Sequence, residues 1–255
     1  MPNIQQLIAL REKYHAKNNI SIKQLTVLNE NFKFSTDRIR NSFSNNRIDD
    51  KIVQFFEEQR SATLVMMYID ITNFSNICKH FSNSLLASYL DQYYDAVIPL
   101  IYRHGGEIEK IMGDGIIAIF GQPFLDDSHD GLLSKADLCA KDIIIDLEGS
   151  HREVKIAFHE GTIMYYKNKA LNYPEYTMIG KPLTELFRLE SVAKNNSITF
   201  YGECHYDGKS YSLSTAYCRS TNSPVECKYF TKSAAQTVTL QGVDYKNIKH
   251  LTCKL

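Results

Sequence analysis

The spacing of hydrophobic residues changes near residue 58 of this chain. Before that point apolar residues recur at helical spacing, as at Ile4 and Ile8, and Ser21 is a typical N-cap for a second helix. The pattern therefore predicts a helical N-terminal extension over residues 1–57 and a separate domain over residues 58–255.

The second domain is predicted to combine strands with amphipathic helices. A six-residue apolar run is typical of a buried strand, and two apolar segments around residues 113–115 (Gly-Asp-Gly) are typical of a hairpin. The predicted segments are strand 64–69, a helix from Ser82 to Gly105, strands 107–112 and 116–120, helix 126–148, strands 154–165 and 176–180, helix 182–193, strands 198–201 and 211–218, and strands within 238–255. The order β-α-β-β-α-β indicates an α+β fold with a ferredoxin-like core, in which helices cover a mostly antiparallel sheet.

Composition argues against several classes of protein. The 255 residues contain 29 Lys+Arg and 29 Asp+Glu, so the chain lacks the basic excess of a nucleic-acid-coating protein. No apolar run is long enough to span a membrane, and the first residues lack the apolar segment of a signal peptide. The six cysteines show no Cys-x-x-Cys spacing, which is typical of reduced thiols. We therefore expect a cytoplasmic protein with no nucleic-acid or membrane partner.

Two aspartates stand out by their positions. Asp70 follows the first predicted strand, and Asp114 lies in the predicted hairpin turn. In a ferredoxin-like sheet the strands that carry Asp70 and Asp114 are neighbours, so both carboxylates can meet at one edge. A divalent cation such as Mg²⁺ or Mn²⁺ relieves the repulsion between two carboxylates and keeps positions open for a polyphosphate. The alternatives are that Asp114 is an ordinary turn residue and that Asp70 caps a helix.

Four blocks of this sequence resemble the class III nucleotidyl cyclases. They are residues 68–75 (YIDITNFS), 109–115 (EKIMGDG), 118–121 (AIFG) and 176–180 (YTMIG), the last followed by Arg188. The blocks occur in the family's order at its usual separations, and the resemblance covers about residues 60–255.

The resemblance implies an intramolecular displacement on a nucleoside triphosphate. The ribose 3′-hydroxyl attacks the α-phosphorus and pyrophosphate leaves, with two divalent cations, Mn²⁺ or Mg²⁺, as cofactors. The implied ligands of the cations are the side chains of Asp70 and Asp114 and the backbone carbonyl of Ile71. The implied phosphate cradle consists of backbone N–H groups of Asn73, Phe74 and Ser75.

Arg188 matches the arginine with which this family stabilises charge on the α-phosphate in the transition state. Thr184 replaces the asparagine that usually stands four residues earlier. Gln241 replaces a lysine that usually contacts the triphosphate, so we expect Lys246 or Lys249 to take that role if any lysine does. The resemblance also implies a homodimer with composite sites, in which one chain supplies the cations and the other the arginine and the base contacts.

Two positions of the resemblance concern the base. Lys110 and Thr177 match the base-reading residues of adenylate cyclases. Tyr68 replaces a phenylalanine and, by strand alternation, points to the same face as Asp70, where it can occupy space that a purine would use. In these changes the chain is most similar to the cytidylate cyclases of bacterial Pycsar antiphage systems. That similarity implies CTP as substrate and a separate effector that binds the cyclic nucleotide, with adenylate cyclase activity as the alternative.

Three other interpretations follow from the sequence. Residues 105–107 (Gly-Gly-Glu) are similar to a diguanylate cyclase signature, but here they end a helix instead of forming the hairpin turn. The changes at Thr184 and Gln241 also suit a non-catalytic cyclase-like binding module. An irregular zinc site is conceivable at Cys204, His205, Cys218 and Cys227.

Overall fold

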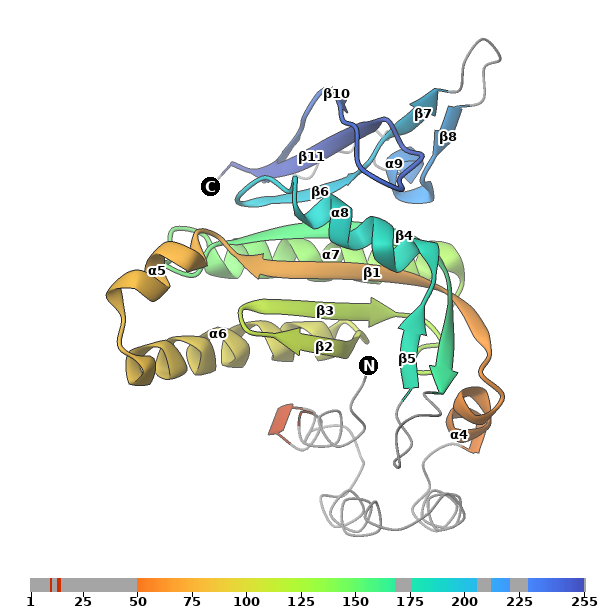
Figure 1. Cartoon of the computed structure of the whole chain (residues 1–255), viewed down its shortest axis with the longest axis horizontal. Helices are drawn as coiled ribbons and strands as arrows, with labels where there is room; N and C mark the ends of the chain where they lie inside the picture. The colour runs from red at the N-terminus through yellow and green to blue at the C-terminus, as the bar shows by residue number, and fades with distance from the viewer. Residues whose placement is uncertain are drawn as a thin grey trace.

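The computed structural model describes residues 10, 13–14, 50–167, 176–205, 212–220 and 229–254 of the chain (Figure 1). The helices predicted around Ile4 and after Ser21 lie outside these residues, as does Cys227 of the conceivable zinc site.

Seventeen elements follow one another in the described part of the chain. They are α4 (Asp50–Glu57), β1 (Ser61–Ile71), α5 (Phe74–His80), α6 (Asn83–Arg103), β2 (Glu107–Met112), β3 (Gly115–Phe120), α7 (His129–Leu147), β4 (Val154–Lys167), β5 (Tyr176–Ile179), α8 (Lys181–Glu190), β6 (Ser197–Tyr201), β7 (Glu203–His205), β8 (Ser212–Ser214), α9 (Ala216–Ser220), β9 (Phe230–Lys232), β10 (Gln236–Thr237) and β11 (Asn247–Cys253). No helix of the described residues has the length and apolar character needed to cross a bilayer.

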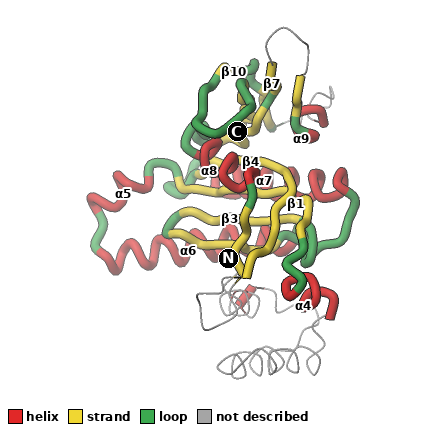
Figure 2. The backbone as a smooth tube through the Cα atoms, turned by 45° about the vertical axis from the view of Figure 1, so that its right-hand side comes forward, coloured by secondary structure: helices red, strands yellow, loops and turns green. Residues whose placement is uncertain are grey.

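The main sheet has the strand order β10-β11-β6-β4-β1-β3-β2, with β5 paired to β4 and β9 paired to β11. Strand β1 lies antiparallel between β3 and β4, and β4 runs parallel to β6. The predicted α+β fold and its β-α-β-β-α-β order are therefore confirmed. Figures 1 and 2 show α5 and α6 extending from one end of the sheet, whereas α4 lies at the opposite end.

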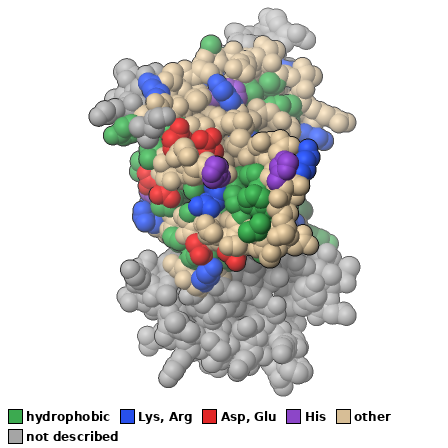
Figure 3. Space-filling view, turned by 90° about the vertical axis from the view of Figure 1, so that its left-hand side faces the viewer, with side chains coloured by type: hydrophobic (Ala, Val, Ile, Leu, Met, Phe, Trp, Pro, Cys, Tyr) green, Lys and Arg blue, Asp and Glu red, His purple; other side chains and the backbone are tan. Residues whose placement is uncertain are grey.

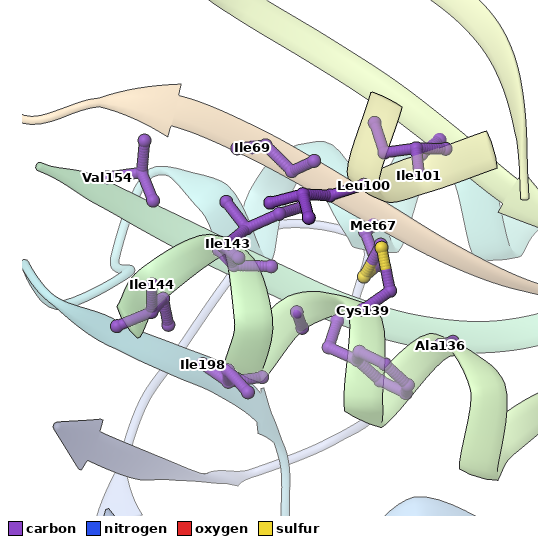
Figure 4. Close-up of a cluster of buried hydrophobic side chains, with 14 of the residues drawn as sticks. Met67, Ile69, Leu100, Ile101, Ala136, Cys139, Ile143, Ile144, Val154 and Ile198 are labelled. Atoms are coloured by element: carbon purple, nitrogen blue, oxygen red, sulfur yellow. The ribbon is translucent and has the colours of Figure 1, made fainter. Parts of the chain in front are cut away.

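The two faces of the sheet carry different layers. The face that we call the apolar face packs on α6 and α7 through Met67 and Ile69 of β1 and through Ile143 of α7, all fully buried (Figure 4). The opposite face, which we call the α8 face, carries Leu64 and Met66 of β1 and is covered by α8 and α4. Each fully buried aliphatic side chain stabilises the fold by about 1.5–3 kcal/mol.

The long helix α6 begins where its sequence predicts. The Ser82 hydroxyl accepts a hydrogen bond from the Leu85 backbone N–H at 3.4 Å, as expected of an N-cap. At the other end, Gly105 has a φ of 80°, a left-handed conformation that ends the helix.

The strand predicted over 211–218 is wrong in its second half. Strand β8 ends at Ser214, and helix α9 begins at Ala216. The Thr215 hydroxyl accepts a hydrogen bond from the backbone N–H of Cys218 at 3.0 Å, which is an N-cap contact. A local hydrogen bond of this kind outweighs the β propensity of the segment.

Candidate active site

Asp70 and Asp114 meet at one end of the sheet. Asp70 is the penultimate residue of β1, and Asp114 follows Gly113, whose φ of 61° suits the tight turn between β2 and β3. The pairing of Ile69 with Ile116 places that turn beside the end of β1. Burial and then the negative charge of the neighbouring Asp70 raise the pKa of Asp114 to about 7.

This carboxyl pair suits a divalent cation. Two half-buried carboxylates at one end of a sheet repel each other, and a divalent cation between them relieves that repulsion. Ile71 ends β1 with its side chain 1% exposed in the core, so it has only its backbone carbonyl to offer. Within the described residues no three His, Cys, Asp or Glu side chains cluster as potential metal ligands.

Lys155 adds a positive charge that the sequence analysis missed. Its ammonium lies 3.3 Å from Oδ2 of Asp70 and 2.6 Å from Oε1 of Glu190 at the end of α8. Burial lowers the pKa of Lys155, but the two carboxylates outweigh burial and raise it overall. The sequence does contain a cue to Lys155, because this lysine stands between the apolar residues Val154 and Ile156, which are buried on the other face of β4. In the structure Lys155 pairs directly with Asp70.

Lys249 does not reach this end of the sheet's α8 face. Its ammonium donates to Sγ of Cys218 at 3.6 Å, and Cys218 belongs to the cluster on the apolar face. Of Lys155 and Lys249, it is Lys155 whose ammonium contacts an aspartate of the pair.

Helix α5 begins directly after β1. Asn73 has a φ of 61° and precedes Phe74 and Ser75, the first two residues of the helix. The first N–H groups of any helix have no partner within it, so they are available to other acceptors. Helix α5 contains no buried residue, and Figure 3 shows acidic and basic side chains close together at this end of the molecule.

A β-bulge determines where Lys110 points. Ile108 pairs with Ala118, but Lys110 pairs with Ile117, so Glu109 is the extra residue of β2. Because Ile117 also pairs with Tyr68, Lys110 and Tyr68 lie in one row across β2, β3 and β1 on the α8 face. Strand alternation without the bulge would turn Lys110 to the other face.

Thr177 is exposed on β5, and its side chain does not share the α8 face with Lys110. The neighbouring residues Tyr176 and Met178 are buried in the α8-face cluster, so alternation turns Thr177 the other way. No hydrogen bond joins the side chains of Lys110 and Thr177, both of which the structure describes.

Tyr68 fills space between the sheet and α8. A Cβ atom on Gly115 would lie 2.5 Å from the Tyr68 hydroxyl, so this tyrosine requires a glycine beside it. Its ring meets that of Phe187 edge to face at 5.7 Å. Burial, then the charges of Asp70, Glu190 and Asp114, raise the pKa of Tyr68 to about 12. Tyr68 and Asp70 therefore lie on the same face of β1, as strand alternation predicts.

Helix α8 presents Thr184 and Arg188 to the outside. Both are exposed, whereas Leu186 and Leu189 are fully buried against the sheet. Among the described residues, no carboxylate forms an ion pair with the Arg188 guanidinium. The arginine is thus directed away from its own sheet and free to approach another molecule.

Comparisons with known proteins identify the family. The family model described as "Adenylate and Guanylate cyclase catalytic domain" matches residues 56–242. The protein named "Uncharacterized protein Rv1319c" of Mycobacterium tuberculosis (strain ATCC 25618 / H37Rv) is 29% identical over 140 residues, 54% of this chain and 25% of that protein. "Uncharacterized protein Rv1320c" of the same strain is 24% identical over 188 residues, 73% of this chain and 30% of that protein. The chain thus spans only a quarter to a third of these relatives.

Solved structures share the fold. The guanylyl cyclase Cya2 superposes with a TM-score of 0.60 at 17% identity, covering 77% of this chain and 95% of that one. The adenylyl cyclase CyaB from P. aeruginosa superposes with a TM-score of 0.57 at 17% identity, covering 77% and 96%. Together with the match over most of the chain, these findings place the protein in the adenylate and guanylate cyclase catalytic-domain family, the class III nucleotidyl cyclases.

Proposed function

We propose that this protein converts a nucleoside triphosphate into a 3′,5′-cyclic nucleotide and pyrophosphate. The ribose 3′-oxygen forms a bond to the α-phosphorus, the bond from that phosphorus to the bridging oxygen of pyrophosphate breaks, and the hydroxyl proton leaves to solvent. The observation that carries the proposal is the close pair of carboxyl groups, Asp70 and Asp114, with Lys155 beside it. Retention of this pair argues against a non-catalytic binding module.

The residues at the end of the sheet have distinct proposed roles. Asp70, Asp114 and the Ile71 carbonyl hold Mn²⁺ or Mg²⁺, and these cations, when bound, neutralise the triphosphate and acidify the 3′-hydroxyl. Lys155 exchanges a carboxylate partner for a phosphate oxygen. The backbone N–H groups that face the phosphates come from Asn73, Phe74 and Ser75.

Arg188 and Thr184 act from a second copy of the chain. Their exposure on the outer side of α8 supports a homodimer with composite sites. In that dimer the Arg188 guanidinium stabilises charge on the α-phosphate, and Thr184 donates to the ribose. The solved guanylate cyclase domain of RhGC from Catenaria anguillulae, which shares this fold, is in complex with GTP, and this supports the substrate class.

We propose CTP as the preferred substrate. Tyr68, held between Gly115 and Phe187, occupies volume on the face that carries Lys110, and a filled pocket excludes a two-ring base. Cytosine presents two acceptors, its N3 and its carbonyl, to which the Lys110 ammonium can donate, whereas uracil presents an N–H in place of the N3 acceptor. ATP is the second candidate, because Lys110 and Thr177 also match adenylate cyclases.

The proposed product is a second messenger in antiphage defence. Cyclic CMP made in the cytoplasm, where nucleoside triphosphates are found, would activate a separate effector with a cyclic-nucleotide-binding domain. This role rests on the similarity to Pycsar cyclases.

One experiment tests the reaction and the base together. The protein is incubated with ATP, CTP, GTP and UTP, each with Mn²⁺, and the products are identified by mass. We expect cyclic CMP as the main product, and we expect Tyr68→Ala to raise the ATP rate relative to CTP while Tyr68→Phe retains the preference. Efficient cyclic AMP formation with inert CTP would instead assign an adenylate cyclase, and no cyclic product from any triphosphate would refute the cyclase activity.

A further inference from the structure

Helix α8 contacts strand β4 at three places along its length. Pro182 lies over Gly161, where an added Cβ would come within 2.3 Å of the proline ring. Glu185 faces His159, and Glu190 faces Lys155. The outer contacts are the close packing of Pro182 on Gly161 and an ion pair whose side chains are each 21% exposed, but the middle contact is a buried polar pair.

The middle contact joins an acid and a histidine inside the α8 face. Nε2 of His159 lies 3.1 Å from Oε2 of Glu185, and the two side chains are 1% and 6% exposed. Nδ1 of His159 is buried with no hydrogen-bond partner among the described residues. Packing alone does not explain such a pair, since hydrophobic residues of similar volume are often as stabilising or more so.

The backbone of the same glutamate is held by a second strand. The Tyr201 hydroxyl on β6 donates a hydrogen bond of 2.7 Å to the carbonyl of Glu185. The ring of Tyr245 stacks on Tyr201 at 4.7 Å, and both rings meet His159 edge to face. Lys181 lies 3.6 Å from the other carboxylate oxygen but is itself exposed and paired with Asp244. One residue of α8 is thus fixed through both its side chain and its backbone.

The exposed residues Thr184 and Arg188 lie beside Glu185 on the same helix. Thr184 precedes Glu185, and Arg188 follows it by three residues, so any rotation of α8 about its axis moves both. Hydrogen bonds depend on direction, whereas apolar contacts tolerate rotation and sliding. A misplacement of about 1 Å in a group that acts on the transition state can cost 100-fold in rate.

We propose that His159 and Glu185 are positioning residues, which fix the rotation of α8 so that Arg188 reaches the active site of the second chain. The proposal rests on the proposed cyclase activity and on its composite site. It assigns the buried pair a role in catalysis that acts through the arginine, with no contact to the substrate.

The first test replaces both polar partners by apolar residues of similar size. In His159→Leu/Glu185→Met we expect an unchanged or higher thermal unfolding midpoint. We expect kcat to fall at least about tenfold with the KM of the best triphosphate changed less than about threefold, because the arginine acts in the transition state. Glu185→Gln retains a hydrogen-bond acceptor and should keep kcat within about threefold of wild type. A folded double variant with kcat within about twofold of wild type would overturn the proposal.

The second test asks in which chain the pair acts. The double variant is mixed with Asp70→Ala, so that mixed dimers combine intact aspartates of one chain with an intact α8 of the other. We expect recovery to about a quarter of wild-type activity, since half of randomly exchanged dimers are mixed and each has one complete site. Absence of recovery would show that the pair acts on its own chain's aspartates, contrary to the proposal.

A control mixture tests the composite site independently of His159 and Glu185. Recovery in a mixture of Asp70→Ala with Arg188→Ala establishes the composite site. If that mixture stays inactive, the composite site is refuted, and with it the proposal that the pair serves a second chain. If the double variant does not fold, Tyr201→Phe, which removes only the hydroxyl that binds the Glu185 carbonyl, takes its place in both tests. A wild-type kcat in Tyr201→Phe would then count against positioning.

Discussion

The two faces of the sheet differ in the polarity of the side chains that are buried on them. The strand residues buried under α6 and α7 include Phe158, Ile198 and Leu251. Their sequence neighbours His159, Thr199 and His250 are also buried, and alternation turns them to the α8 face. Burying polar groups costs free energy unless they are hydrogen-bonded, and it fixes geometry when they are.

This difference indicates a division of roles within one sheet. The apolar face supplies burial, which is non-directional and tolerates changes of shape at constant volume. The α8 face holds directional contacts around Asp70, Lys155 and Glu185. We therefore expect substitutions on the apolar face to change stability, and substitutions on the α8 face to change activity.

The largest expected effect is loss of either carboxylate. Asp70→Ala or Asp114→Ala should lower kcat/KM by at least about 1,000-fold, because the cations lose a ligand, while stability stays the same or rises as repulsion is removed. Product is measured by mass, and stability by urea unfolding. Asp146→Ala, an exposed carboxylate on α7, is the matched control and should be fully active. Activity within a few-fold of wild type in either site variant would contradict the cation assignment.

Loss of the arginine should be the next largest effect. Arg188→Ala should lower kcat about 100-fold or more with little change in stability, because the exposed guanidinium pairs with no described carboxylate of its own chain. Single-turnover and steady-state rates on the best triphosphate check this. Unchanged kcat would leave the outer side of α8 without a catalytic role.

A substitution in the core tests whether the apolar face contributes to stability without contributing to activity. Ile143→Ala on α7 removes a fully buried side chain and should lower the free energy of unfolding by about 2–5 kcal/mol. The kcat of the folded protein should stay within about twofold of wild type. Leu138→Ala on the same helix, where the leucine is 50% exposed, is the control and should cost under about 1 kcal/mol. A large fall in kcat for Ile143→Ala would break the division between the faces.

The smallest expected effect concerns His250. Burial, then the charge of Lys194, lower the pKa of this histidine in the folded chain, and Thr199 shares a hydrogen bond of 2.8 Å with its Nδ1. Below pH 6.5, its ordinary pKa, the unfolded chain takes up a proton that the folded chain does not, so acidification lowers the free energy of unfolding. The slope is at most about 1.4 kcal/mol per pH unit for one proton.

Urea unfolding at several pH values between 7.5 and 5.5 measures this slope. His250→Gln should show a smaller fall in stability on acidification than wild type. Equal slopes in the two proteins would mean that the buried histidine does not contribute to the pH dependence.

Local sequence patterns predicted much of the fold and the aspartate pair. The hairpin around Asp114, the N-cap at Ser82 and the buried strand before Asp70 depend on residues close together in the chain, where turn chemistry and periodicity act. The same reasoning failed at residues 215–218, where one threonine hydroxyl redirected the backbone into α9.

Other features depended on contacts between distant residues. The approach of Lys155 to Asp70, the bulge at Glu109 that turns Lys110, and the pair of His159 with Glu185 each join different elements. The sequence by itself determined most of the segments that form strands, helices and turns, because these follow from short-range periodicity and capping. Only the tertiary structure decided which polar side chains face one another, because strand register and the rotation of a helix on a sheet are settled by contacts between elements far apart in the chain.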